Sequence, residues 1–316
     1  MIINRGQAYF PSVIEPIVWE DELRGSPSKL TFTVIKGQKL NFQEGNPVRF
    51  KYNDEKIFFG FVFTKKRDRE HHIEVTCYDQ IRYLKNKDTM LFENKSLSEM
   101  VKQIGSIHPS LNLGDIDDTG LKIKSLLCDN ESYLDMIYKG IDHTITYKKK
   151  MYVLYDDFGK LCLKDIDNLK IDGFLISDEN MENFDYKSSI DEETYNQIKL
   201  VYENEETGKR EVYLTKDTNS INNWGLLQYY ETIDENTNGK VKADVLLELY
   251  NKKTRSLTVK GVRGNPKVRG GFRVMVMLNV GDIILQNYLI VSSVKHTFDE
   301  SHHTMDITFI GGGFSA

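Results

Sequence analysis

Pairs of acidic residues are the first feature of this chain that could do chemistry. Asp156-Asp157 and, further on, Asp165 and Asp167 resemble the carboxylate pairs of acid/base catalysis. Such catalysis needs two carboxyl groups that face one cleft with separated pKa values. Here the acids lie in and after a hairpin turn that ends at Gly159, where Asp is favoured for local backbone hydrogen bonding. The pattern therefore favours turn residues over a glycosidase.

Three histidines near the end of the chain suggest a metal site. They are His296, His302 and His303. Imidazole ligands must converge on the ion, with a carboxylate or a further His to complete the shell. His302 and His303 are adjacent at an expected hairpin turn, and neighbouring side chains of extended backbone point apart. The spacing therefore does not support a metal centre.

A thiol nucleophile would require Cys77 beside His71 or His72. In the segment from His72 to Tyr78, however, Ile73, Val75 and Cys77 share one face of an expected strand. A small thiol on an apolar face is typical of a core residue.

A glycine-rich, basic segment runs from Gly261 to Gly271 and includes Arg263, Lys267 and Arg269. Phosphate-binding loops of the strand–loop–helix type need a helix after the glycines. A strand pattern follows instead. We interpret the segment as a tight loop between strands, and we also consider it as a place for a subunit contact.

The elements that would position these residues begin with a β-rich block over residues 1–85. Short runs of Val, Ile, Phe and Tyr are separated by Gly, Pro and Asn-Asp turns. They predict strands at Val13 to Leu23, Leu30 to Ile35, Val48 to Tyr52, Ile57 to Phe63 and His72 to Tyr78. This spacing favours a small barrel or sandwich. Lys65-Lys66-Arg67 falls between two strands, which predicts a solvated hairpin tip.

Two capped helices mark the polar middle of the chain. An apolar helical pattern follows Asn94-Lys-Ser96, and another follows Asn130-Glu-Ser132, thirty-six residues later. Asp135 occupies the same position after Ser132 as Glu99 does after Ser96. The match could mark a repeat or could be two ordinary capped helices, because this cap chemistry is common. Strands are expected at Thr144 to Tyr147, Met151 to Tyr155 and Lys160 to Lys164, and a polar loop at Asn112 to Gly120.

A second β-rich block closes the chain and is interrupted by an amphipathic helix at Lys240 to Lys253. Strands near 175–214 are expected to pair with strands near 256–311. The predicted fold class is α+β, mainly β, with two small β-barrel domains and smaller α/β domains. The predicted divisions are an N-terminal barrel at 1–88, an α/β domain with two helices and a hairpin at 89–174, and a second, discontinuous barrel at 175–316, made of 175–214 and 256–316 around a helical insertion at 215–255.

The composition excludes several classes of protein. A net charge of −5, 40% hydrophobic and 28% charged residues describe an ordinary globular chain without the basic stripe of a nucleic-acid binder. Three cysteines without a CxxC pair argue against zinc, redox and disulfide roles. No segment has the length and composition of a signal peptide or a membrane span, so we expect folding in the cytoplasm. We predict no enzyme, no catalytic, cofactor-binding or metal-binding residues, and no cofactor.

Three segments, in order, resemble one family. They are Tyr155-Asp-Asp-Phe-Gly-Lys-Leu-Cys-Leu-Lys-Asp-Ile166, Trp224-Gly-Leu-Leu-Gln-Tyr-Tyr-Glu231, and Tyr288 to His296 followed by His302-His-Thr-Met-Asp-Ile-Thr-Phe-Ile-Gly311. They are similar to the XkdQ/YqbQ proteins of PBSX-type prophages and R-type bacteriocins, and the likeness covers residue 75 to the end. The N-terminal block matches by strand pattern alone.

The resemblance implies a structural protein of a contractile phage tail or bacteriocin, similar to the baseplate hub proteins of T4-like and Mu-like phages. It implies a homotrimer whose six barrels join a sixfold tail tube to a threefold central spike. Its partners would be the tube protein, the spike protein, and other baseplate and LysM-type tail proteins, with no membrane and no sequence-specific nucleic acid. The chain would be in the bacterial cytoplasm during assembly and then in a particle released by lysis.

Two other functions remain open at this point. The chain could be a cell-wall hydrolase delivered by such a particle, in which Asp156 and Asp157 would act. It could also be a glycan-binding module, which needs an aromatic platform that Trp224, Tyr229 and Tyr230 would have to supply. Aromatic residues near a helix start are more often part of a core.

Overall fold

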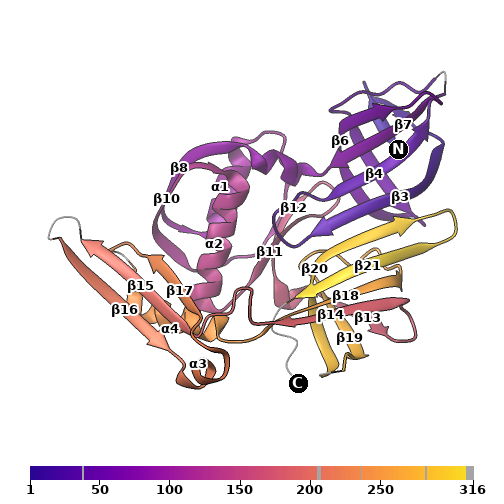
Figure 1. The fold of residues 1–316 in the computed structure, drawn as a ribbon. Helices are drawn as coiled ribbons and strands as arrows, with labels where there is room; N and C mark the ends of the chain where they lie inside the picture. The colour runs from indigo at the N-terminus through magenta and orange to yellow at the C-terminus, as the bar shows by residue number, and fades with distance from the viewer. Residues whose placement is uncertain (38, 205–207, 236, 282, 311–316) are drawn as a thin grey trace. The chain divides into compact units, whose positions relative to one another are not determined.

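The computed structural model describes residues 1–37, 39–204, 208–235, 237–281 and 283–310, and these form two compact units (Figure 1). Unit 1 contains residues 1–185 and 257–316, and unit 2 contains residues 186–256. Most elements are strands, and the predicted α+β, mainly β class is confirmed. None of the described helices is long and apolar enough to span a membrane.

The N-terminal block of unit 1 is an antiparallel sheet with strand order β3-β4-β7-β6-β5-β1-β2. Alternate residues point inward, so that Leu30, Phe32 and Val34 of one strand are buried beside Val75 and Cys77 of its neighbour. The strands are β1 (Ile2–Asn4), β2 (Gln7–Tyr9), β3 (Val13–Glu22), β4 (Lys29–Ile35), β5 (Pro47–Tyr52), β6 (Glu55–Arg67) and β7 (His72–Tyr78). The path is open among the described residues, so this block is not a closed barrel.

The middle of unit 1 packs two helices against a two-stranded ribbon (Figure 1). Each strand of the ribbon leads into a helix through the same conformation: Asn94 and Asn130 are left-handed, and Ser96 and Ser132 cap the helices. A three-stranded sheet completes the core. The elements are η1 (Gln80–Lys85), β8 (Lys87–Ser96), α1 (Leu97–Ile107), β9 (Leu113–Ile116), β10 (Lys122–Ser132), α2 (Tyr133–Lys148), β11 (Tyr152–Asp156), β12 (Leu161–Asp165) and η2 (Ile166–Asn168).

The predicted strand at Thr144 to Tyr147 is wrong, because these residues form the last turn of α2. Their β-branched side chains suggested a strand. The helix continues because Ile141 and Thr144 face the core, and it is capped by Lys149, whose backbone is left-handed. The segment from Asn112 to Gly120, predicted as a loop, contains β9. The ribbon strands β8 and β10 were not predicted at all.

The C-terminal block of unit 1 joins the N-terminal block through one long strand, β20. One part of β20 pairs with β19, and its last residues, Ser293 to Phe298, pair with Ile17 to Glu22 of β3. The two β-rich ends of the chain therefore share a single hydrogen-bonded sheet. The block's strands are β13 (Lys170–Ser177), β14 (Asn183–Ser189), β18 (Thr254–Arg263), β19 (Arg273–Asn279), β20 (Ile284–Phe298) and β21 (His303–Ile310). The Gly311 end of the third family segment lies outside the described residues.

Unit 2 is a small sheet with one helix on one face. Ile198 and Leu200 of the central strand pack against Ala243 and Leu246 of the helix. Its elements are β15 (Gln197–Asn204), β16 (Lys209–Lys216), α3 (Thr218–Trp224), β17 (Gln228–Thr232) and α4 (Gly239–Tyr250). β13 and β14 pair with β19 and β18, as expected for strands near 175–214. β15 pairs with β16 and β17 instead, so the expected pairing is wrong for residues 197–214. The predicted domain limits themselves stay a proposal.

Candidate functional site: the junction of the two β blocks

The pairing of β3 with β20 is reinforced by a stack of rings. Trp19 of β3 and His296 of β20 are register partners, and their rings stack at 4.5 Å between centroids. Phe298 stacks on His303 of β21 at 4.1 Å, and Tyr52 of β5 contacts both of these rings. Side chains from four strands of the two blocks therefore form one packed column.

The two histidines of this column are hydrogen-bonded to each other. Nε2 of His296 lies 2.9 Å from the carbonyl oxygen of Val268, so it carries the proton and donates it. Nδ1 of His296 then accepts from Nε2 of His303, also at 2.9 Å. Burial lowers the pKa of His296 to about 3 and that of His303 to about 4. Both rings are therefore neutral at physiological pH, and neither nitrogen of His296 is free to bind a metal.

A buried arginine lies beside this column. Arg269 comes from the loop between β18 and β19, and its Nε and Nη2 donate to the two carboxylate oxygens of Asp21 on β3 at 3.1 and 3.4 Å. Its Nη1 donates to the backbone oxygen of Asp156, at the end of β11, at 2.5 Å. The guanidinium also lies over the rings of Trp19 and Tyr155 at 5.2 and 5.3 Å. One side chain thus connects three parts of unit 1.

Two further carboxyl groups lie close enough to act on this cation. Burial, followed by repulsion from Asp156 and Asp21, raises the pKa of Asp79 well above its ordinary value. Burial also raises the pKa of Asp156 to about 6, against the hydrogen bonds that its carboxylate accepts from Gly159 and Gln80. The junction therefore holds one arginine among three carboxyl groups. Because the pKa values of Asp79 and Asp156 are raised, these two carboxyl groups keep protons in the folded chain at pH values where an unfolded chain would release them.

The glycines of the loop allow this close packing. A Cβ on Gly270 would lie 2.2 Å from the backbone carbon of Glu22, and one on Gly264 would lie 2.1 Å from the ring of His303. The predicted inter-strand loop is therefore confirmed. Its buried end, from Val268 to Gly271, lies inside unit 1, where a subunit contact could not reach it.

The predicted carboxylate pair is separated by the structure. Asp156 is buried in the junction, whereas Asp157 is exposed in the hairpin turn. Asp165 caps η2 by accepting from the backbone of Asp167, and it also pairs with Lys150. Asp156 accepts from Gln80 and Asp167 from Arg273, so these acids have separate partners and do not face a common cleft.

The structure also separates the residues of the proposed thiol site and of the proposed aromatic platform. Cys77 is fully buried, which raises the pKa of its thiol, and His72 pairs instead with Asp68. The prediction that Lys65-Lys66-Arg67 forms the hairpin tip is wrong, because these residues are the end of β6 and pair with β7, and the turn follows at 68–71. In unit 2, Tyr229 packs in the helix-covered core, whereas Tyr230 is half-exposed on the opposite face of the sheet. The two tyrosines therefore do not form a platform with Trp224.

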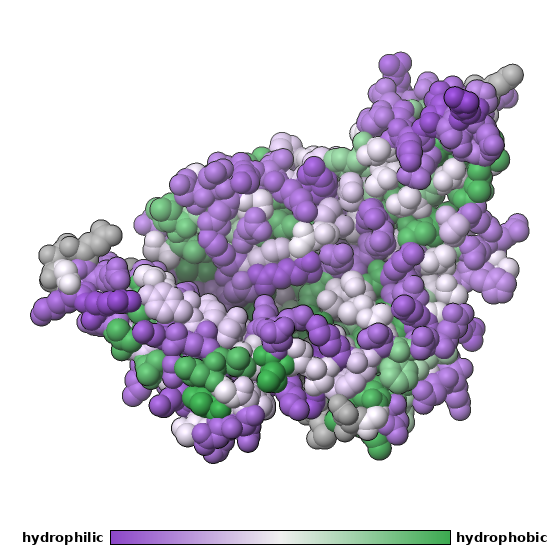
Figure 2. All heavy atoms as spheres, viewed as in Figure 1, coloured by the Kyte–Doolittle hydropathy of each residue, from purple (hydrophilic) through white to green (hydrophobic). Residues whose placement is uncertain are grey.

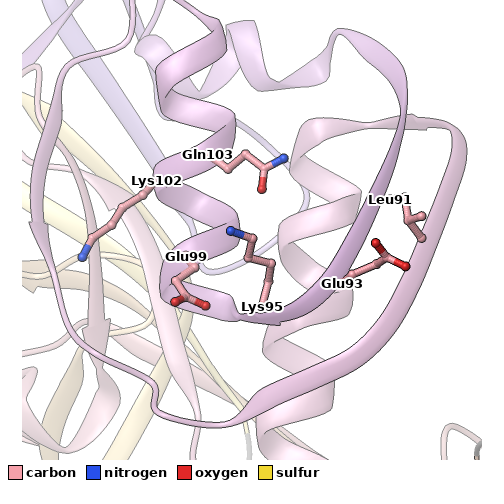
Figure 3. A pocket seen from close by; sticks show the side chains of 6 residues that line it. All are labelled: Leu91, Glu93, Lys95, Glu99, Lys102 and Gln103. Carbon is pink, nitrogen blue, oxygen red and sulfur yellow. The ribbon is translucent and has the colours of Figure 1, made fainter.

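An open pocket of about 630 Å³ lies between β8 and α1 (Figure 3). Its lining includes Glu93, Glu99, Lys95 and Lys102. Glu99 is occupied, because it accepts from the backbone of Ser96 and from Lys122, and these bonds lower its pKa to about 2. A carboxylate held in this way cannot serve as a general acid near neutral pH.

The sequence reasoning missed the role of Arg269. A signal existed, because the two glycines after the arginine indicate a site where other backbone approaches closely. Nothing in the sequence, however, identifies Asp21 as its partner, 248 positions away.

The fold and junction define a mainly β protein in which both β-rich blocks of the chain form one sheet, and solved structures with a similar fold exist. The structure is similar to the prophage MuSo2 43 kDa tail protein from Shewanella oneidensis, with a TM-score of 0.71, 12% identity, and coverage of 98% of this chain and 97% of that one. It is also similar to the E. coli c3393 protein, described as a type VI secretion component with structural similarity to the T4 tail proteins gp27 and gp5 (TM-score 0.61, 9% identity, 100% and 77% coverage).

The family model for YQBQ-like proteins matches residues 17–310, so the chain belongs to that family. A curated relative is the phage-like element PBSX protein XkdQ of Bacillus subtilis strain 168, 28% identical over 98% of this chain and 96% of the relative. The predicted family is therefore confirmed.

Proposed function

We propose that this chain is a structural protein of a phage-type tail and forms the hub of its baseplate as a homotrimeric ring. The observation that carries the proposal is the junction. β20 pairs with β3, and Arg269 bridges both blocks, so the two β modules of one chain are joined by a shared sheet and a buried ion pair. A protein whose function is geometric needs such fixed modules more than it needs a reactive cleft.

Two β modules per chain suit a change of symmetry. Three chains would supply six modules to a ring, which matches a sixfold tail tube on one side and leaves threefold symmetry for a central spike on the other. A ring also covers strand edges that a single subunit leaves open. The tail proteins to which this fold is similar support the assignment.

In this proposal the chain has no enzymatic activity. Its partners are the tail tube protein, the central spike protein, and other baseplate and LysM-type tail proteins. It assembles in the bacterial cytoplasm and leaves the cell in a particle released by lysis. The same arrangement would serve a phage or a headless bacteriocin.

The test is made on particles from a producing strain and from the same strain lacking this chain. The deletion should abolish baseplates and leave tubes absent or unattached. Mass-spectrometric counting against the other tail proteins should give three copies per particle. Normal baseplates in the deletion strain, or one copy per particle, would contradict the proposed function.

A further inference from the structure

Two oppositely charged surfaces lie at separate ends of the large sheet in unit 1. The strand path of that sheet starts at β14 and ends at β2, so both of these strands have an open edge among the described residues. A head-to-tail contact between copies requires two different, complementary surfaces on each copy. The charges near the two edges meet that requirement.

The first surface, which we name the basic end, is one end of the N-terminal block. Its loops are connected: Asn4 donates to the backbone of Asn41, Lys65 to that of Phe42, and the backbone of Lys36 to that of His71. Six of its cations are exposed and have no acidic partner among the described residues: Arg5, Lys36, Lys39, Lys66, Arg67 and Arg69. Figure 2 shows this end, above β6 and β7, as a hydrophilic surface.

The acids of the basic end do not neutralise it. Glu44 pairs with Lys65 at 3.4 Å, and Asp68 and Glu70 both approach His72. Glu74 also lies opposite Lys66 in the strand register, so four acids stand against Lys65 and the six exposed cations, and this end keeps a net positive charge. Arg5 lies in the turn between β1 and β2, which connects this charge to the open β2 edge.

The second surface, which we name the acidic margin, follows β13 and the start of β14. Residues 171–185 contain five acids and no Lys or Arg. All five are exposed, and none has a cationic partner among the described residues: Asp172, Asp178, Glu179, Glu182 and Asp185. Four of these acids, from Asp178 to Asp185, lie in the connection to β14 or at its start, beside that open edge, and Asp172 lies on β13.

Each surface also has an exposed apolar residue nearby. Phe10, directly after β2, is 81% exposed, and Leu175 of β13 is 39% exposed. Interfaces commonly combine an apolar contact with a charged rim that steers and orients the partner. Both surfaces have this composition.

We propose that the partner of the basic end is the acidic margin of a second copy of this chain. The inference rests on the proposed function, because it names the contact that would close the trimer. Each copy would offer the basic end to one neighbour and the acidic margin to the other, which generates a closed ring if the rotation fits. A contact of this kind weakens with salt, since screening shortens from about 10 Å at 0.1 M to about 3 Å at 1 M.

The test uses four charge variants of the full chain and sedimentation velocity. One variant reverses the basic end (Lys66→Glu, Arg67→Glu and Arg69→Glu), one reverses the acidic margin (Asp172→Lys, Asp178→Lys and Glu179→Lys), and one combines both sets. The matched control makes the same charge change as the basic-end reversal, but elsewhere in unit 1, with Lys85→Glu, Lys87→Glu and Lys102→Glu. Circular dichroism checks that each variant is folded.

The wild type should be a trimer at about 0.1 M salt and should dissociate at about 1 M. Each single reversal should weaken association by about 100-fold, because three exposed attractions become repulsions. The combined variant should be trimeric again, since its two surfaces are complementary once more, and the control should behave as the wild type.

Three results would overturn this contact: a trimer that tolerates either reversal, a folded combined variant that stays monomeric, or a wild type that is monomeric at about 0.1 M salt. None of them contradicts the hub itself if particles still contain three copies, so the two proposals fail separately. If the basic-end reversal instead leaves the trimer intact but removes binding to a DNA fragment, the basic end serves nucleic acid and the inference is wrong.

Discussion

Replacing Arg269 by Met tests how the two β blocks are held together. The substitution keeps much of the volume of the side chain but removes its charge. Asp21, only 6% exposed, then has no cation, and the backbone oxygen of Asp156 loses its donor. The rings of Trp19 and Tyr155 also lose the charge between them.

The expected loss of stability is about 3–5 kcal/mol, the range for leaving one partner of a buried ion pair without the other. The matched control is Arg273→Met, because Arg273 pairs with Asp167 through an acid that is 69% exposed. Such a pair contributes less than about 1 kcal/mol. A double variant, Arg269→Met with Asp21→Asn, should recover part of the loss because it removes the unpaired charge.

The assay is urea unfolding at pH 7 followed by tryptophan fluorescence, since Trp19 lies in the junction itself. A free-energy change for Arg269→Met as small as that for Arg273→Met would refute the argument. So would a double variant less stable than the sum of its single changes.

Three further perturbations test the same junction. The pKa values of His296 and His303 are lowered to about 3 and 4, so the stability that these residues contribute is complete above about pH 6.5 and is lost as the pH falls through 4 toward 3. His303→Phe, which keeps a ring on Phe298, should flatten this slope in urea titrations, and an unchanged slope would contradict it. The raised pKa of Asp156, about 6, gives stability the opposite dependence on pH. Up to about 3 kcal/mol of stability is present below about pH 4 and is lost as the pH rises to 6, and Asp156→Asn should remove that dependence. Gly270→Ala should lower the free energy of unfolding by at least about 2 kcal/mol, because the new Cβ would meet backbone atoms. The control Gly37→Ala places its Cβ in open space and should change that free energy by no more than about 0.5 kcal/mol in thermal unfolding. Equal effects would refute the steric argument.

Local signals in the sequence predicted local structure well. The Ser96 and Ser132 caps and the alternation that buries Cys77 depend on residues within a few positions of each other. Such patterns report the period of the backbone and the chemistry of its ends.

Long-range pairing was not predictable in the same way. The sequence gives β15 and β16 the same alternation as the last strands, so nothing in it separates them into their own sheet with β17. Pairing of β3 with β20 and of Asp21 with Arg269 joins residues more than 240 positions apart. Strand register and buried ion pairs at this distance depend on the folded chain as a whole.

The most direct measurement for the hub is a cryo-electron microscopy map of the baseplate in particles from a producing strain, calculated without imposed symmetry. We expect three copies of this chain around the axis, with both β blocks of each copy in one ring of six modules and the β3–β20 pairing intact. A ring of six copies that each contribute one block, or a copy outside the ring between tube and spike, would contradict this expectation.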